Sequence, residues 1–118
     1  MMSDFKNQIT PFKWIEHEDS VSVIMSDVGD YKQHIFDNRA DEDFEGNGYD
    51  WQSLAVVFLD EKMPHLTDKI HFDSESSMFC VWANHADTNA LKEFIIAFKN
   101  ALDDNELILD LFSRAELD

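Results

Sequence analysis

The chain of 118 residues contains one cysteine, two prolines and three glycines, and it has no apolar run long enough to cross a membrane. A single thiol excludes a disulfide framework and a four-cysteine zinc site. So little Gly and Pro argues against a disordered or low-complexity chain. The N-terminal residues lack the basic-then-apolar order of a secretory signal. We therefore expect one globular domain over residues 1–118, located in the cytoplasm.

Positive charge is also scarce. Nine Lys and Arg oppose 25 Asp and Glu, which gives a formal net charge of −16. Such a surface repels nucleic-acid phosphates and anionic membranes, so we expect the chain to bind neither. Three explanations of the acidity remain open: solubility, a basic protein partner, or a carboxylate site for a metal.

Apolar and aromatic residues are abundant, with a hydrophobic content of 44% and ten Phe. Alternating apolar and polar side chains predict half-buried antiparallel strands, most clearly over 20–26, where Val21, Val23 and Met25 share one face. Trp82 stands in an apolar run that predicts a strand covered on both faces. The first three strands favour a meander because their connections are short. The predicted strands cover 12–16, 20–26, 31–36, 69–72 and 78–83.

Helical spacing of apolar side chains follows the third predicted strand. The pattern from Trp51 to Leu59 predicts a helix that Asp50 caps and that ends before Pro64. A second helix is expected over 87–102, and a short amphipathic one begins near 103–106, at capping-box spacing. The order βββ-α-ββ-α-α predicts an α+β fold, with helices packed on one face of a mainly antiparallel sheet.

The longest polar segment, 37–50, is the best candidate for a metal loop. Asp41, Asp43 and Glu45 match the first three ligand positions of a calcium loop, and Gly46 follows them. The twelfth position is not the glutamate that calcium loops require. None of the five histidines stands in a zinc-binding pair. We therefore expect no metal and no cofactor, with metal or small-molecule binding through this segment as an alternative.

Catalytic constellations are absent from the sequence. Cys80 lies in the most apolar segment, where a thiolate is disfavoured. No serine stands in a G-x-S-x-G elbow, and no glycine-rich loop precedes a lysine. Paired carboxylates occur throughout the chain and so single out no acid–base pair. We expect a protein that is not an enzyme and has no catalytic residues.

One stretch resembles a known family. Residues 45–55, EGNGYDWQSLA, together with 69–73, 78–80 and 90–94, are similar to the immunity protein 51 family. The similarity extends from about residue 12 to residue 111. Members of that family accompany polymorphic toxin systems in bacteria. The resemblance implies a non-enzymatic protein that binds and neutralises a cognate toxin domain.

Five residues are the candidates for contact with that partner. Asp41, Glu42, Asp43 and Glu45 form the densest acidic cluster and are expected to steer a basic toxin surface toward the chain. Tyr49 stands where this segment meets the predicted helix and is a candidate aromatic anchor. An acidic nucleic-acid mimic, which would occupy the DNA channel of another protein, is the remaining alternative.

Overall fold

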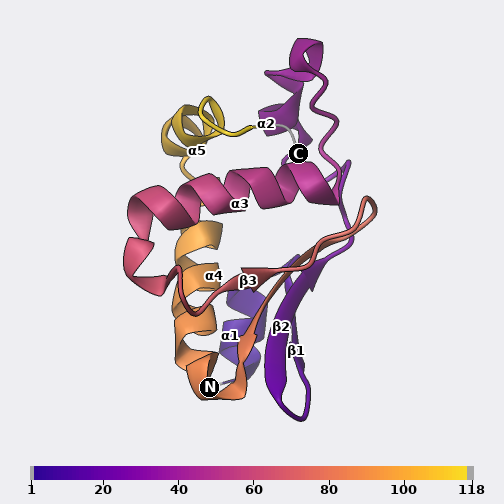
Figure 1. Ribbon diagram of the computed structural model, residues 1–118. Helices are drawn as coiled ribbons and strands as arrows, with labels where there is room; N and C mark the ends of the chain where they lie inside the picture. Colours follow the sequence, from indigo (N-terminus) through magenta and orange to yellow (C-terminus); the bar gives the residue numbers. More distant parts are fainter. Residues whose placement is uncertain (1, 117–118) are drawn as a thin grey trace.

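The computed structural model describes the backbone of residues 2–116 and the side chains of residues 5–116 (Figure 1). It contains an antiparallel sheet and α-helices, so the predicted α+β class is confirmed. The strands are β1 (Lys13–Glu16), β2 (Ser20–Met25), β3 (His71–Phe72) and β4 (Phe79–Asn84). The α-helices are α1 (Met2–Gln8), α2 (Gln33–Asp37), α3 (Gly48–Lys62), α4 (Thr88–Leu102) and α5 (Asn105–Phe112), and the short 3-10 helices are η1 (Ala40–Glu42), η2 (Pro64–Leu66) and η3 (His85–Asp87).

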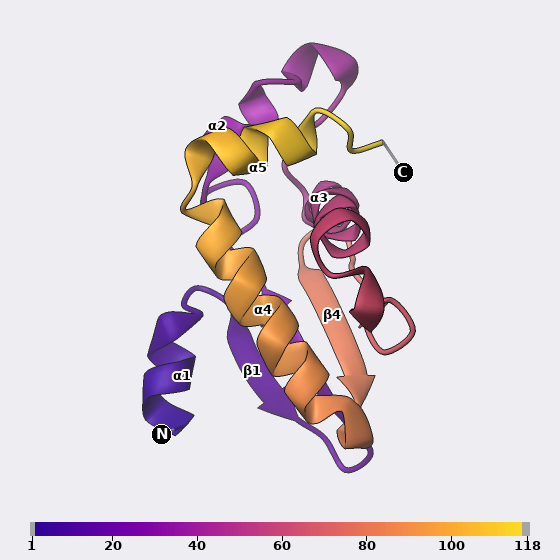
Figure 2. The same ribbon diagram turned by 90° about the vertical axis from the view of Figure 1, so that its left-hand side faces the viewer.

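The four strands have the order β1-β2-β4-β3, and every neighbouring pair is antiparallel. Trp14, Val23, Val81 and Phe72 stand opposite one another across the sheet and therefore share one face. Helices α1, α3 and α4 lie on one side of the sheet in Figure 1, and Figure 2 shows α4 in front of the strands. No helix in the described part of the chain is long and apolar enough to cross a membrane.

Trp51 lies at the centre of the core and is fully buried. Its ring centroid is 5.1 Å from that of Phe36 and 6.1 Å from that of Phe12. The rings of Phe79 and Phe98 both lie 6.4 Å away. These neighbours come from α2, the segment before β1, β4 and α4, so one side chain from α3 joins most of the layers. The predicted burial of Trp51 is confirmed.

The predicted third strand, 31–36, is wrong. The chain forms α2 there instead, after Lys32 adopts the left-handed conformation with φ of 53°. Ile35 and Phe36 are consecutive and both fully buried, whereas a strand would send them to opposite faces. One edge of β2 pairs with β1 and the other pairs with β4. No edge of β2 therefore remains for the third strand that the predicted meander requires.

Other differences are smaller. Helix α1 has no counterpart in the sequence prediction, and its Phe5 packs edge-on against Trp14 at 5.2 Å. Trp82 is half-buried instead of covered on both faces, because it points to the side of the sheet away from α3 and α4 and lies against His71, with 4.5 Å between ring centroids. The capping-box spacing over 103–106 places the cap of α5 at Asp103, but Asp104 is the cap and accepts a hydrogen bond from the Leu107 amide. The strands predicted over 69–72 and 78–83 are His71–Phe72 and Phe79–Asn84.

Candidate protein interface

Helix α3 begins with a reciprocal set of hydrogen bonds. The side chain of Asn47 accepts from the Asp50 amide at 2.9 Å, so Asn47 is the N-cap and the prediction of Asp50 in that role is wrong. The Asp50 carboxylate is buried and accepts from the amides of Glu45 and Gly46 at 2.7 and 2.9 Å. The acidic segment is therefore fixed to the helix that follows it.

The two glycines beside Asn47 have different roles. Gly46 has φ of +88°, the left-handed conformation that glycine adopts without strain. Gly48 lies against the turn between β3 and β4, where its amide donates to the Ser76 carbonyl at 3.0 Å. A Cβ at Gly48 would collide with the backbone carbonyls of Glu75 and Met78. The start of α3 is thus held against this turn by close backbone contact.

Arg39 attaches the acidic segment to the end of α5. Its guanidinium donates to the carbonyls of Phe112 and Ala115, both at 2.6 Å, and lies 4.5 Å from the centroid of the Phe44 ring. It also forms an ion pair with Glu42, with 3.0 Å between Nε and Oε2. The hydrogen bond from Arg39 lowers the pKa of Glu42 below its ordinary value. One cation therefore holds together segments that are distant in the sequence.

The five predicted contact residues lie along one short piece of chain. Asp41 and Asp43 are exposed and have no ion-pair partner in the part of the chain that the structure describes. The exposed carboxylate of Glu42 is shared with Arg39, while Glu45 is exposed next to the fixed start of α3. Tyr49, in the first turn of α3, is 42% exposed and is the one large hydrophobic side chain that is exposed among the described residues.

Sequence reasoning missed the acids that α5 brings to the same end of the molecule. Residues 30–50 and 103–116, which we call the acidic pole, contain twelve of the 25 Asp and Glu but three of the nine Lys and Arg. His34 and Asn105 join the two segments through a side-chain hydrogen bond of 3.0 Å. The three cations are all in ion pairs: Lys32 with Asp103, Arg39 with Glu42, and Arg114 with Glu61 and Asp110. Apart from the buried Asp50, the remaining carboxylates of the pole are exposed and keep their charge unpaired within the described residues.

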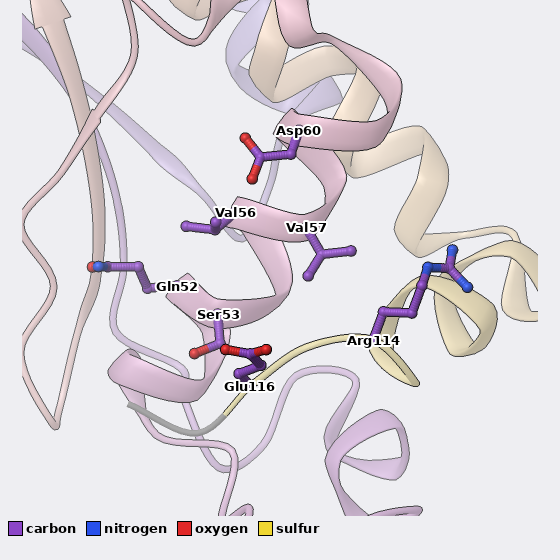
Figure 3. Close-up of a pocket in the computed structure, with 7 residues that line it drawn as sticks. All are labelled: Gln52, Ser53, Val56, Val57, Asp60, Arg114 and Glu116. Carbon is purple, nitrogen blue, oxygen red and sulfur yellow. The ribbon is translucent and has the colours of Figure 1, made fainter.

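A groove of about 410 Å³ runs along α3 (Figure 3). One wall of the groove is α3, and the opposite wall is the chain that follows α5. Val56 and Val57 lie between the two ends of the groove. The groove is lined by Gln52, Ser53, Val56, Val57, Asp60, Arg114 and Glu116. Arg114 is held by Glu61 and Asp110, which raise its pKa and leave it charged, and its guanidinium points away from the groove.

Comparison with known proteins identifies the family. A family model described as immunity protein 51 matches residues 12–117. The chain belongs to the immunity protein 51 family. The resemblance noted in the sequence is thereby confirmed, and the match spans the sheet, the acidic pole and the groove. No curated protein and no solved structure matches the chain.

Membership in an immunity protein family assigns a role in toxin neutralisation in general, which implies a toxin as partner. Families of this kind are generally non-enzymatic.

In this immunity protein, His17 Nε2 and Ser22 Oγ lie 3.1 Å apart on the sheet face turned away from α3 and α4. Burial, with a smaller contribution from Asp73, raises the pKa of the nearby Cys80 thiol, which makes it a poor nucleophile.

The acids of the 37–50 segment do not form a calcium loop in this immunity protein. Residues 40–42 form η1, and Asp43 then turns into the left-handed conformation with φ of 74°. Within the described residues, no three His, Cys, Asp or Glu side chains gather in an arrangement that would hold a metal ion. The structure therefore gives no support to the metal-binding alternative.

The Arg39 contacts predict a measurable contribution to stability. We expect Arg39→Lys to lower the free energy of unfolding by about 1–3 kcal/mol, because lysine keeps the charge but loses the forked donors that reach Phe112, Ala115 and Glu42. Urea denaturation followed by circular dichroism measures the change. Lys32→Arg, at an ion pair nearby, is the matched control and should leave the midpoint unchanged. Equal midpoints for both variants would contradict the role given to Arg39.

Proposed function

We propose that this protein neutralises a cognate toxin by binding it directly through the acidic pole. Asp41, Glu42, Asp43 and Glu45 supply charge that attracts a basic toxin surface, and Tyr49 supplies an aromatic anchor. The family match is the observation that carries the proposal. The concentration of exposed carboxylates around one exposed aromatic side chain supports the choice of surface.

The physical case depends on complementary charge. Toxins that act on nucleic acids need basic surfaces to engage phosphate groups, and an acidic protein that covers such a surface blocks access to it. Long-range attraction also speeds the encounter, and the effect weakens as salt screens the charges. Because Arg39 and Asp50 hold the acidic segment in place before binding, little conformational entropy is lost in the complex.

Association kinetics test this surface. We expect the triple variant Asp41→Asn, Asp43→Asn, Glu45→Gln to bind about tenfold more slowly than the wild type and with a flatter dependence on salt, because exposed charges act mainly on the association rate. The measurement is surface plasmon resonance at two salt concentrations against the purified cognate toxin domain. Glu42 is left unchanged because it is paired with Arg39.

The matched control removes the same number of charges from the turn between β1 and β2. This control is Glu16→Gln, Glu18→Gln, Asp19→Asn, at three exposed side chains. The turn between β1 and β2 lies at the opposite end of the sheet from the acidic segment in Figure 1. The association rate of this control should stay close to that of the wild type. Equal slowing by both triple variants would show that only net charge matters. An unchanged rate in the acidic-pole variant would place the toxin elsewhere on the molecule.

A further inference from the structure

The groove beside α3 offers a specific chemistry to a bound partner. Asp60 stands at one end and Glu116 near the other, with Val56 and Val57 between them (Figure 3). In the part of the chain that the structure describes, neither carboxylate has a cation within ion-pair distance. The groove therefore combines a half-buried apolar wall with exposed negative charge at both ends.

The cation that lines the groove does not neutralise it. Arg114 donates to Glu61 at 2.7 and 2.8 Å and to Asp110 at 3.0 Å, so its guanidinium is already held between two carboxylates. The hydroxyl of Ser53 is also engaged, since it donates to the Tyr49 carbonyl at 3.2 Å. The polar groups of the groove that remain free are therefore mainly the carboxylates of Asp60 and Glu116, which attract positive charge.

The groove is continuous with the surface proposed for the toxin. Tyr49 precedes Ser53 by one helical turn, so the exposed ring and the groove occupy the same side of α3. Interfaces concentrate their binding energy in a few aromatic and cationic anchors that enter pockets near the centre of the contact. A ring and an adjacent acidic groove fit that arrangement.

We propose that this groove receives a lysine or arginine side chain of the toxin, an inference that rests on the proposed function. The aliphatic stem of the incoming side chain lies along Val56 and Val57, as long cationic side chains do on apolar surfaces. Its charged head pairs with Asp60 or Glu116, whose negative charge is complementary to it. The partner chemistry is thus a protruding basic residue and not a diffuse basic surface alone.

Dissociation kinetics distinguish this anchor from simple steering. In the same surface plasmon resonance experiment, we expect Asp60→Asn combined with Glu116→Gln to raise the dissociation rate about tenfold, with the association rate changed by less than about threefold. The partner covers these two charges in the complex, whereas the steering charges at the rim stay in solvent. Asp60→Lys should weaken the complex further, because it places a like charge against the incoming side chain. Both variants should melt at the wild-type temperature, since Asp60 and Glu116 are exposed.

Glu18→Gln combined with Asp68→Asn is the matched control, since both carboxylates are exposed and neither lines the groove. It should dissociate at the wild-type rate. An unchanged dissociation rate in the groove variants would overturn the anchor while leaving the proposed function intact, as would an effect confined to the association rate. Failure of the wild-type chain to bind the toxin domain would overturn the proposed function and the anchor together.

Discussion

Trp51→Ala is expected to lower the free energy of unfolding by about 3–5 kcal/mol, the usual cost of removing a large buried aromatic side chain. Trp51 is fully buried and lies within 6.4 Å, centroid to centroid, of the rings of Phe12, Phe36, Phe79 and Phe98. Truncation leaves a cavity that rings from several elements would have to fill. Since small domains have total stabilities of about 5–15 kcal/mol, the variant should be close to unfolding.

Urea denaturation monitored by circular dichroism measures this loss. Tyr49→Ala is the matched control because it truncates an aromatic residue in the first turn of the same helix, where the side chain is 42% exposed. We expect it to cost less than about 1 kcal/mol of stability. Similar losses for the two variants would contradict the central position of Trp51 and the exposure of Tyr49.

Gly48→Ala is expected to lower the free energy of unfolding by about 3 kcal/mol, although replacing glycine by alanine within a helix normally raises it. The added Cβ would overlap the backbone carbonyls of Glu75 and Met78, which cannot rotate aside as the end of a flexible side chain would. The turn between β3 and β4 would have to move away from α3. That displacement would also break the hydrogen bond from the Gly48 amide to the Ser76 carbonyl.

Gly29→Ala separates collision from backbone strain. Gly29 has φ of +90°, and a Cβ there would meet no atom within 4 Å. We expect a loss of about 1 kcal/mol from the left-handed conformation alone. Thermal melts of both variants give the comparison. If Gly48→Ala were as stable as Gly29→Ala or more stable, the contact between Gly48 and the turn between β3 and β4 would be loose.

Local periodicity was sufficient to predict the elements in which apolar side chains recur at the spacing of one buried face. The alternation of Val21, Val23 and Met25 correctly placed β2, and the helical spacing after Trp51 correctly placed most of α3. The error at 31–36 arose because β4, far along the chain, occupies the edge of β2 that a third strand would need. Nothing in the local pattern of Ile35 and Phe36 reports that competition.

The candidate site shows the same division. The acids at 41–45 and Tyr49 were visible as a cluster because they are adjacent in sequence. The acids of α5 join them only through contacts such as those of Arg39 with Phe112 and Ala115, which are more than seventy residues away. The groove likewise forms between α3 and the chain that follows α5, which are distant in the sequence. A pattern read along one segment reveals neither the acidic pole nor the groove as a unit.

The pairing of β2 with β4 has a consequence for synthesis of the chain. Met25 pairs with Phe79 and Ser20 with Asn84, so the centre of the sheet joins residues more than fifty positions apart. Pairing over such a distance slows folding, because a large loop must close before these contacts form. While a ribosome makes the chain, β2 and α3 emerge before β4 exists, and Trp51 has no complete core to enter. The sheet can therefore form only after residue 84 has left the ribosome, so the folded protein appears with a delay after its synthesis begins.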